Sequence, residues 1–170
     1  SFEHMERIVK VGIIGCGGIA NGKHMPSLKQ IPNVQMVAFC DIKPERAEKA
    51  KAEYGTPDAK VYTDYKELLL DPEIEVVHVL TPNRSHADIS IDALNAGKHV
   101  MCEKPMAKTA ADARRMYEAA KVTGKKLTIG YQHRQKPESI YAKQYIDSGA
   151  LGEIYYANCY AIRRRGTPNW

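Results

Sequence analysis

Residues 8–20, with the sequence IVKVGIIGCGGIA, join a buried strand to a glycine-rich turn. The apolar run at 8–14 is broken only by Lys10 and Gly12, as expected of a strand covered on both faces. The turn fits the pattern G-x-G-x-x-A, in which small residues let backbone N–H groups approach a pyrophosphate at a helix N-terminus. We therefore predict a dinucleotide-binding turn made of Gly15, Gly17, Gly18, Ile19 and Ala20.

An acidic residue ends the second predicted strand. Asp41 lies 21 residues after Ala20, where a carboxylate can accept hydrogen bonds from the adenosine ribose. A carboxylate at this place also repels a 2′-phosphate, which favours NAD over NADP. Lys43 and Arg46 weaken that preference, so NADP is the alternative cofactor. A second interpretation stays open, in which Asp41 caps the helix that begins at Pro44.

Short apolar runs alternate with longer amphipathic stretches along most of the chain. Helices that separate successive strands imply parallel pairing and right-handed connections. The pattern predicts an α/β fold with a doubly wound parallel sheet, the Rossmann fold. The predicted strands are 8–14, 34–40, 60–62, 75–80, 99–102 and 126–131, and the predicted helices are 19–30, 44–54, 65–70, 83–95 and 109–122. Pro26 should shorten or kink the first of these helices.

The pattern changes after Tyr131. We expect a dinucleotide-binding domain at residues 7–131. At 132–170 we expect a linker helix and the first strand of a truncated α+β substrate or oligomerisation domain. The helix is predicted at 137–147 and a Tyr-rich strand at 153–162, which without a partner would be a bare sheet edge.

Composition excludes several classes of protein. The chain has 170 residues and a net charge of +5, with 26% charged and 44% hydrophobic residues, unlike a disordered chain. No apolar run approaches the roughly 18 residues that span a bilayer, and we expect a cytoplasmic protein with no membrane partner. We expect no metal site, because the cysteines lack zinc-site spacing and fit small buried hydrophobic positions. They are Cys16, Cys40, Cys102 and Cys159.

Two further loops follow predicted strands, where open α/β sheets bind their ligands. The first contains Thr81, Pro82 and Asn83. Asn83 can cap the next helix, and His86 within that helix is expected to be a structural hydrogen-bonding partner. The second contains Glu103, Lys104 and Pro105. Lys104 can donate to a substrate oxygen, although spacing alone favours a lysine that is paired with Glu103 or solvated.

Taken in order, these motifs resemble the N-terminal domain of the Gfo/Idh/MocA oxidoreductase family. The resemblance rests on the glycine turn, on Asp41, on the Thr81 loop with His86, and on the run GKHVMCEKP at 97–105. The run IDSGALGEI at 146–154 resembles the segment by which this family enters its C-terminal domain.

The resemblance implies a dehydrogenase that moves hydride between nicotinamide and a hydroxyl- or carbonyl-bearing carbon of a sugar, cyclitol or related polyol. Lys104 would be the catalytic residue that bonds the reacting oxygen, Glu103 would position the nicotinamide, and Pro105 would fix the bend through a cis peptide. The implied residues of the cofactor cleft also include Thr81, Pro82, Asn83 and His86. The implied substrate-side residues are Tyr131, His133 and Arg134. Arg163 and Arg164 can reach an anionic or polyhydroxylated substrate, or form a solvated basic run.

Family members continue into a second domain whose Asp-x-x-x-His motif completes the site and through which they associate. We therefore expect this chain to bind dinucleotide but to be catalytically incomplete, and the full-length protein to be a homo-oligomer. The alternative function is a non-catalytic dinucleotide-binding sensor or transcriptional regulator, against which the intact Lys104 argues. Nucleic acid is not an expected partner, because basic and acidic residues are mostly interspersed.

Overall fold

The computed structural model describes residues 7–162 and 164. They fall into two compact units, divided between Tyr131 and Gln132. The described part of the chain contains no helix with the length and apolar character needed to cross a membrane.

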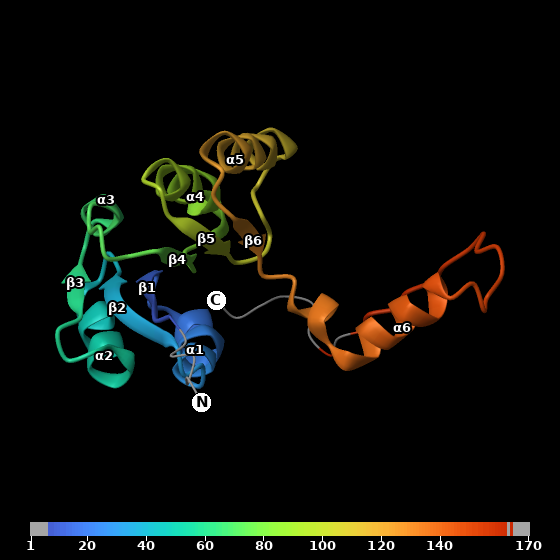
Figure 1. The fold of residues 1–170 in the computed structure, drawn as a ribbon, viewed down its shortest axis with the longest axis horizontal. Helices are drawn as coiled ribbons and strands as arrows, with labels where there is room; N and C mark the ends of the chain where they lie inside the picture. The colour runs from blue at the N-terminus through green and yellow to red at the C-terminus, as the bar shows by residue number, and fades with distance from the viewer. Residues whose placement is uncertain (1–6, 163, 165–170) are drawn as a thin grey trace, which may run out of the picture. The chain divides into compact units, whose positions relative to one another are not determined.

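The first unit is built on a six-stranded sheet. Its strands are β1 (Val9–Ile14), β2 (Val34–Cys40), β3 (Lys60–Tyr62), β4 (Val76–Val79), β5 (His99–Cys102) and β6 (Leu127–Ile129). Their order is β3-β2-β1-β4-β5-β6, and every neighbouring pair is parallel (Figure 1). The chain therefore starts in the middle of the sheet, builds one half and returns to build the other, which confirms the predicted doubly wound fold.

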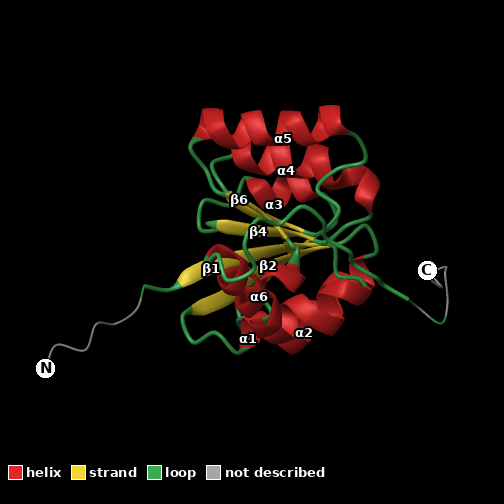
Figure 2. Ribbon diagram, turned by 90° about the vertical axis from the view of Figure 1, so that its right-hand side faces the viewer, coloured by secondary structure: helices red, strands yellow, loops and turns green. Residues whose placement is uncertain are grey.

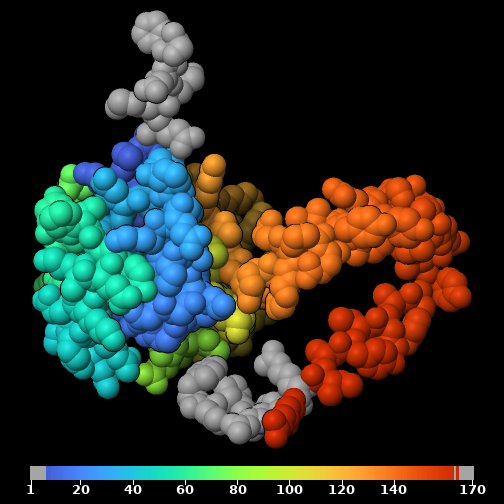
Figure 3. Space-filling model, turned by 90° about the horizontal axis from the view of Figure 1, so that it is seen from below, coloured from blue at the N-terminus to red at the C-terminus, as the bar shows by residue number. Residues whose placement is uncertain are grey.

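Helices cover both faces of this sheet. They are α1 (Met25–Lys29), α2 (Pro44–Tyr54), α3 (Tyr65–Leu69), α4 (His86–Asn95) and α5 (Ala110–Thr123). The helices α3, α4 and α5 lie on one face, and α1 and α2 lie on the other (Figure 2). The second of these layers is the blue-to-cyan surface in Figure 3.

The central strands bury side chains on both faces. Ile13 and Phe39 are buried in the cluster that contains α1 and α2 residues, whereas the adjacent Ile14 and Cys40 are buried in the cluster that contains α3, α4 and α5 residues. Successive side chains of a strand point to opposite faces. Burial on both faces explains why these strands are nearly continuous apolar runs in the sequence.

Local signals set several helix ends where they were predicted. The α2 helix begins at Pro44, and the Asp64 side chain caps α3 by accepting from Lys66 N–H. The Thr109 hydroxyl caps α5 by accepting from Asp112 N–H at 3.1 Å. Gly124 ends α5 in the left-handed conformation, with φ of 66°.

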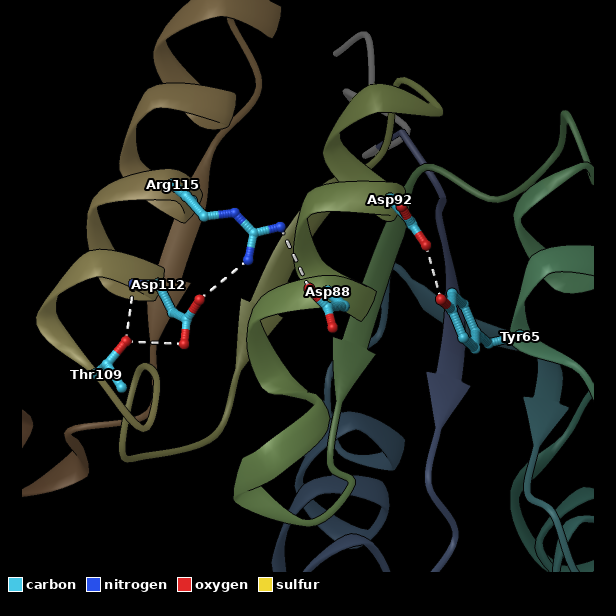
Figure 4. A network of polar contacts seen from close by, with 6 residues as sticks. All are labelled: Tyr65, Asp88, Asp92, Thr109, Asp112 and Arg115. Atoms are coloured by element: carbon cyan, nitrogen blue, oxygen red, sulfur yellow. Dashed lines mark hydrogen bonds and ion pairs between the residues drawn. The ribbon is translucent and has the colours of Figure 1, made fainter.

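Polar contacts join α3, α4 and α5 at their outer surface (Figure 4). Arg115 of α5 donates to Asp112 in its own helix at 3.0 Å and to Asp88 of α4 at 3.4 Å. The Tyr65 hydroxyl of α3 donates to Asp92 of α4 at 2.7 Å. Exposed ion pairs stabilise a fold only slightly, so the apolar cluster beneath these helices holds the layer together.

Two predicted helices are each divided. Residues 19–30 form a π-helical segment, η1 (Ala20–His24), followed by α1 with Pro26 in its first turn. Residues 83–95 form a 3-10 turn, η2 (Asn83–Ser85), followed by α4. The prediction that Asn83 caps the helix is wrong, because Asn83 begins η2 and the residue before α4 is Ser85.

The second unit contains a 3-10 turn, η3 (Gln132–Gln135), and α6 (Pro137–Asp147), which has the predicted bounds. The strand predicted at 153–162 is wrong, since these residues are exposed and join no strand ladder. A strand needs a partner for its backbone N–H and C=O groups, and no described segment supplies one. Cys159 is exposed, so burial is confirmed only for Cys16, Cys40 and Cys102.

Candidate active site

The strand order reverses between β1 and β4, and an open α/β sheet binds its ligands at the carboxyl ends of the strands beside such a reversal. The loops that leave β1, β2, β4 and β5 at this edge carry most of the predicted site residues. This edge is therefore the candidate active site.

The glycine turn after β1 is tight at its first glycine and open at the next two. Gly15 has φ of +96°, and a Cβ there would lie 2.8 Å from the carbonyl carbon and oxygen of Leu80. By contrast, a Cβ on Gly17 or Gly18 would meet no atom within 4 Å. Backbone N–H groups with open space above them are what a diphosphate requires. A dinucleotide therefore fits these residues.

An asparagine that the sequence reasoning missed holds the turn from the helix side. Asn21 Nδ2 donates to the carbonyl oxygens of Cys16 and Gly17, each at 2.8 Å. Ala20 just before it is fully buried, so the helix packs closely against the sheet. An Asn in the first turn after a glycine motif was the available signal, because its side chain commonly bonds nearby backbone groups.

Asp41 reaches the same turn from the end of β2. Its Oδ2 accepts from Cys16 N–H and its Oδ1 accepts from Lys43 N–H, both at 2.9 Å. The residue before α2 is Lys43, so the interpretation of Asp41 as the helix cap is wrong. The buried carboxylate instead connects the second strand to the glycine turn.

The thiols beside this turn are not nucleophiles. Burial, with a contribution from the Asp41 charge, raises the pKa of both Cys16 and Cys40 to about 12. The thiolate is the reactive form, and at neutral pH both groups stay protonated. Their burial in the apolar clusters is therefore a packing role.

The loop after β4 is held by His86. Its Nε2 lies 2.8 Å from Thr81 O and its Nδ1 lies 2.8 Å from Pro105 O. The ring is 1% exposed, so His86 is a structural partner, as its position in the sequence suggested. The expectation from the family resemblance that it lines the cofactor cleft stays a prediction. Pro82 and Asn83 are exposed on this loop.

The loop after β5 presents Lys104 to solvent between two anchored neighbours. The Lys104 main-chain N–H donates to Glu103 Oε2 at 2.9 Å, and the Lys104–Pro105 peptide is cis, as predicted. Within the described residues the Lys104 ammonium forms no ion pair and is exposed, so of the two expected states, paired with Glu103 or solvated, the structure has the solvated one. The amine is therefore free to meet a substrate oxygen.

Two histidines that sequence reasoning missed lie behind this loop. His24 Nε2 lies 2.8 Å from Glu103 Oε1, and His24 Nδ1 lies 3.1 Å from His78 Nδ1. Burial, and secondarily the neighbouring His24 ring, lowers the pKa of His78 to about 3, so this ring is neutral. A histidine between the buried Val77 and Val79 was the available signal, since a polar residue inside a buried strand needs a partner.

The predicted substrate-side residues lie at the end of the first unit and in the second. Tyr131 follows β6 and is exposed. His133 and Arg134 belong to η3 and are exposed, as is Arg164. Arg163 lies outside the described residues. Their part in substrate binding stays a prediction.

Proteins similar to this chain in sequence are oxidoreductases. The sequence model of a family described as an oxidoreductase family with an NAD-binding Rossmann fold matches residues 9–131. Inositol 2-dehydrogenase of Salmonella typhimurium is 40% identical over 146 residues, which are 85% of this chain and 43% of that enzyme. D-glucoside 3-dehydrogenase of Escherichia coli is 37% identical over 162 residues, which are 95% of this chain and 46% of that enzyme.

Solved structures share the fold. A dehydrogenase from Bordetella pertussis in complex with NADH and UDP-GlcNAcA has a TM-score of 0.81 at 28% identity, over 88% of this chain and 42% of that one. A 3-ketoreductase from Actinomadura kijaniata in complex with NADP has a TM-score of 0.77 at 28% identity, over 86% of this chain and 44% of that one. This chain spans less than half the length of each of these relatives. It belongs to the Gfo/Idh/MocA family of oxidoreductases, and its residues 9–131 are the NAD-binding Rossmann domain of that family.

Proposed function

We propose that this protein is an NAD(P)-dependent oxidoreductase that transfers hydride between nicotinamide and a hydroxyl or carbonyl carbon of a sugar, cyclitol or related polyol. Relatives at 37–40% identity are named for oxidation of inositol and of D-glucosides. The observation that carries the proposal is Lys104, which is exposed and without an ion pair among the described residues, and which lies at the strand edge where the glycine turn opens.

The glycine turn and Asp41 are the proposed cofactor contacts. Backbone N–H groups at Gly17 and Gly18 would bind the diphosphate, and the Asp41 carboxylate would accept from the adenosine ribose. Because this carboxylate lies beside the turn, it disfavours a 2′-phosphate, and NAD is the proposed cofactor over NADP. The bound nicotinamide supplies the hydride acceptor or donor.

Lys104 is the proposed catalytic residue. Its ammonium donates a hydrogen bond, and then a proton, to the substrate oxygen when the carbon is reduced. When the carbon is oxidised, the neutral amine accepts the hydroxyl proton. Anchoring of Glu103 and Pro105 on either side limits the positions that the amine can reach. Tyr131, His133, Arg134, Arg163 and Arg164 are the proposed substrate-side residues.

The alternative, a non-catalytic dinucleotide-binding sensor or regulator, is not favoured. The named relatives are dehydrogenases and a reductase, and a sensor has no need of a free amine beside the cofactor turn. Residues 9–131 are proposed to bind the dinucleotide. Three free buried thiols suit a reducing compartment, and the proposed location is the cytoplasm. The homo-oligomer stays a prediction.

The test uses protein expressed from the complete reading frame, assayed for reduction of NAD with myo-inositol, methyl glucosides and related polyols. We expect turnover with at least one of these, and a loss of roughly 100- to 10,000-fold in Lys104→Met, since a positioned acid or base contributes about that much. Lys108→Met, which changes another exposed lysine of the same segment, serves as the control and should keep wild-type turnover. Full turnover in Lys104→Met would refute the role of Lys104. Tight NAD binding with no turnover on the panel would favour a sensor.

A further inference from the structure

Three side chains connect the segment after the glycine turn to the Lys104 loop. They run from His78 through His24 to Glu103, with separations of 3.1 Å and 2.8 Å. The two rings meet edge to face, with centroids 5.3 Å apart. The His24 and Glu103 side chains are only 10% and 12% exposed, so this row of groups lies behind the site and is not part of its open surface.

The direction of the hydrogen bonds can be assigned at the Glu103 end of this row. The Glu103 carboxylate only accepts, and its Oε2 already accepts from Lys104 N–H. Its Oε1 therefore accepts from His24 Nε2–H. The neutral His78 meets His24 through the two Nδ1 atoms, which lie 3.1 Å apart, so one of them donates and the other accepts.

The η1 segment contacts both sides of the site. Its Asn21 donates to two carbonyl oxygens of the glycine turn. Its last residue, His24, bonds Glu103. A π-helical turn of this kind changes the direction in which the following side chains point and recurs at functional sites. A ligand that orders the glycine turn would therefore also act on Glu103 and, through it, on the main chain of Lys104.

Other roles for His24 fit the geometry less well. Among the residues that the structure describes, no group of three or more His, Cys, Asp or Glu is arranged to hold a metal ion. Both His24 nitrogens are already within hydrogen-bond distance of side-chain partners. The ring is therefore not free to exchange a proton with substrate.

We infer that His24 is a positioning residue that couples dinucleotide binding at the glycine turn to the placement of Lys104. This inference rests on the proposed function for the importance of Lys104, but the coupling is a property of the chain alone. His24 acts by holding the Glu103 carboxylate, which holds the Lys104 backbone.

The test compares two variants of the 170-residue chain. In His24→Gln the amide nitrogen can reach the place of Nε2 and still donate to Glu103. In His24→Asn the shorter side chain can replace only the group that faces His78. Hydrogen exchange of the Lys104 amide is measured with and without ADP-ribose, a probe that fills the glycine turn but carries no nicotinamide.

We expect His24→Asn to speed exchange of the Lys104 amide about tenfold, and His24→Gln to restore it to within about threefold of wild type. Amides of β1 and β4 should exchange alike in all three proteins, which a general loss of structure would not produce. ADP-ribose should slow Lys104 exchange in wild type and in His24→Gln but not in His24→Asn. Equal exchange in the three proteins, or an equal response to ADP-ribose, would overturn the inference.

A measurement on the wild-type chain keeps the inference testable if a variant does not fold. Nitrogen NMR should find hydrogen on His24 Nε2, and a His24 Nε2 without hydrogen would refute its bond to Glu103. Neither readout involves turnover. Full activity in Lys104→Met would refute the proposed function. That result is separate from a result that refutes this coupling.

Discussion

The two halves of the site are held in place by different kinds of interaction. On the turn side, which comprises residues 15–20 and Asp41, the main chain of Gly15 lies against Leu80 and a carboxylate accepts from the turn itself. On the lysine side, which comprises residues 103–105 with His24 and His78, side chains separated by 54 and 79 positions meet. The cofactor turn is thus held by main-chain packing and one carboxylate, whereas the reactive loop is held by a row of side chains from three parts of the chain.

The largest effect is expected on the turn side, from substitution of Gly15. Gly15→Ala places a Cβ 2.8 Å from the Leu80 carbonyl group and in a left-handed conformation. We expect a loss of about 3 kcal/mol in the free energy of unfolding, measured by urea denaturation.

Gly17→Ala is the matched control, because its Cβ would meet no atom within 4 Å. It should keep stability to within about 0.5 kcal/mol but weaken NADH binding at least about tenfold, measured by fluorescence titration, since the methyl group takes up room that the diphosphate needs. Equal stability losses in the two variants would contradict the distinction between a tight and an open glycine.

The next largest effect is expected on the lysine side, where low pH should lower stability through His78. The folded pKa of His78, about 3, lies below its ordinary value of 6.5, so only the unfolded chain gains this proton in the interval between them. Titration of His78 therefore leaves the free energy of unfolding unchanged above about pH 6.5. Below that pH it lowers the free energy of unfolding, by up to about 1.4 kcal/mol per pH unit, as the pH drops towards 3.

His78→Asn removes this titration and keeps a polar group beside His24. Urea unfolding at about pH 6.5 and about pH 5 should show that wild type loses up to about 2 kcal/mol more than the variant. His99, whose pKa burial also lowers, is present in both proteins, so the difference reports on His78. Parallel losses in both proteins would show that His78 is protonated in the folded state.

A smaller effect is expected on the turn side from substitution of Asp41, which tests the role of its carboxylate. Asp41→Asn removes the charge that Cys16 N–H and Lys43 N–H face, and we expect a stability loss of about 1 kcal/mol. Removing the carboxylate also removes repulsion of a 2′-phosphate, so the affinity for NADP relative to NAD should rise about tenfold. Titration of both dinucleotides measures the ratio, with Asp58→Asn, at an exposed acid, as the control. Tighter NADP binding by the wild type would overturn the preference for NAD.

The smallest effect is expected on the lysine side from substitution of Gly130, which lies beside Glu103. A Cβ there would lie 3.0 Å from Glu103 Oε1 and 3.3 Å from its Cδ, so Gly130→Ala forces the carboxylate to shift by a few tenths of an ångström. We expect a loss of about 0.5 kcal/mol, together with faster exchange of the Lys104 amide. Gly18→Ala, with no atom within 4 Å of its Cβ, should leave Lys104 exchange unchanged. An unchanged Lys104 amide in Gly130→Ala would mean that Glu103 does not hold this loop.

Much of the fold followed from the sequence because its signals are local. Short apolar runs predicted six strands to within two residues at each end, and Pro44 and Thr109 marked helix starts that the structure confirms. The strand predicted for the tyrosine-rich run at 153–162 is absent, because residues that favour β-structure do not form a strand without a partner. The prediction that Cys159 is buried was wrong for the same reason, since burial depends on what covers a segment.

Local signals in the sequence were enough to predict the doubly wound sheet and the glycine turn, because apolar runs and the conformational freedom of glycine act over a few neighbouring residues. Other features became visible only in the folded chain. His24, His78 and Glu103 meet, Asp41 bonds the turn instead of capping a helix, and His86 is buried. These contacts join residues that are far apart in the chain. They exist because parallel strands bring their carboxyl ends together at one edge, which no short stretch of sequence encodes.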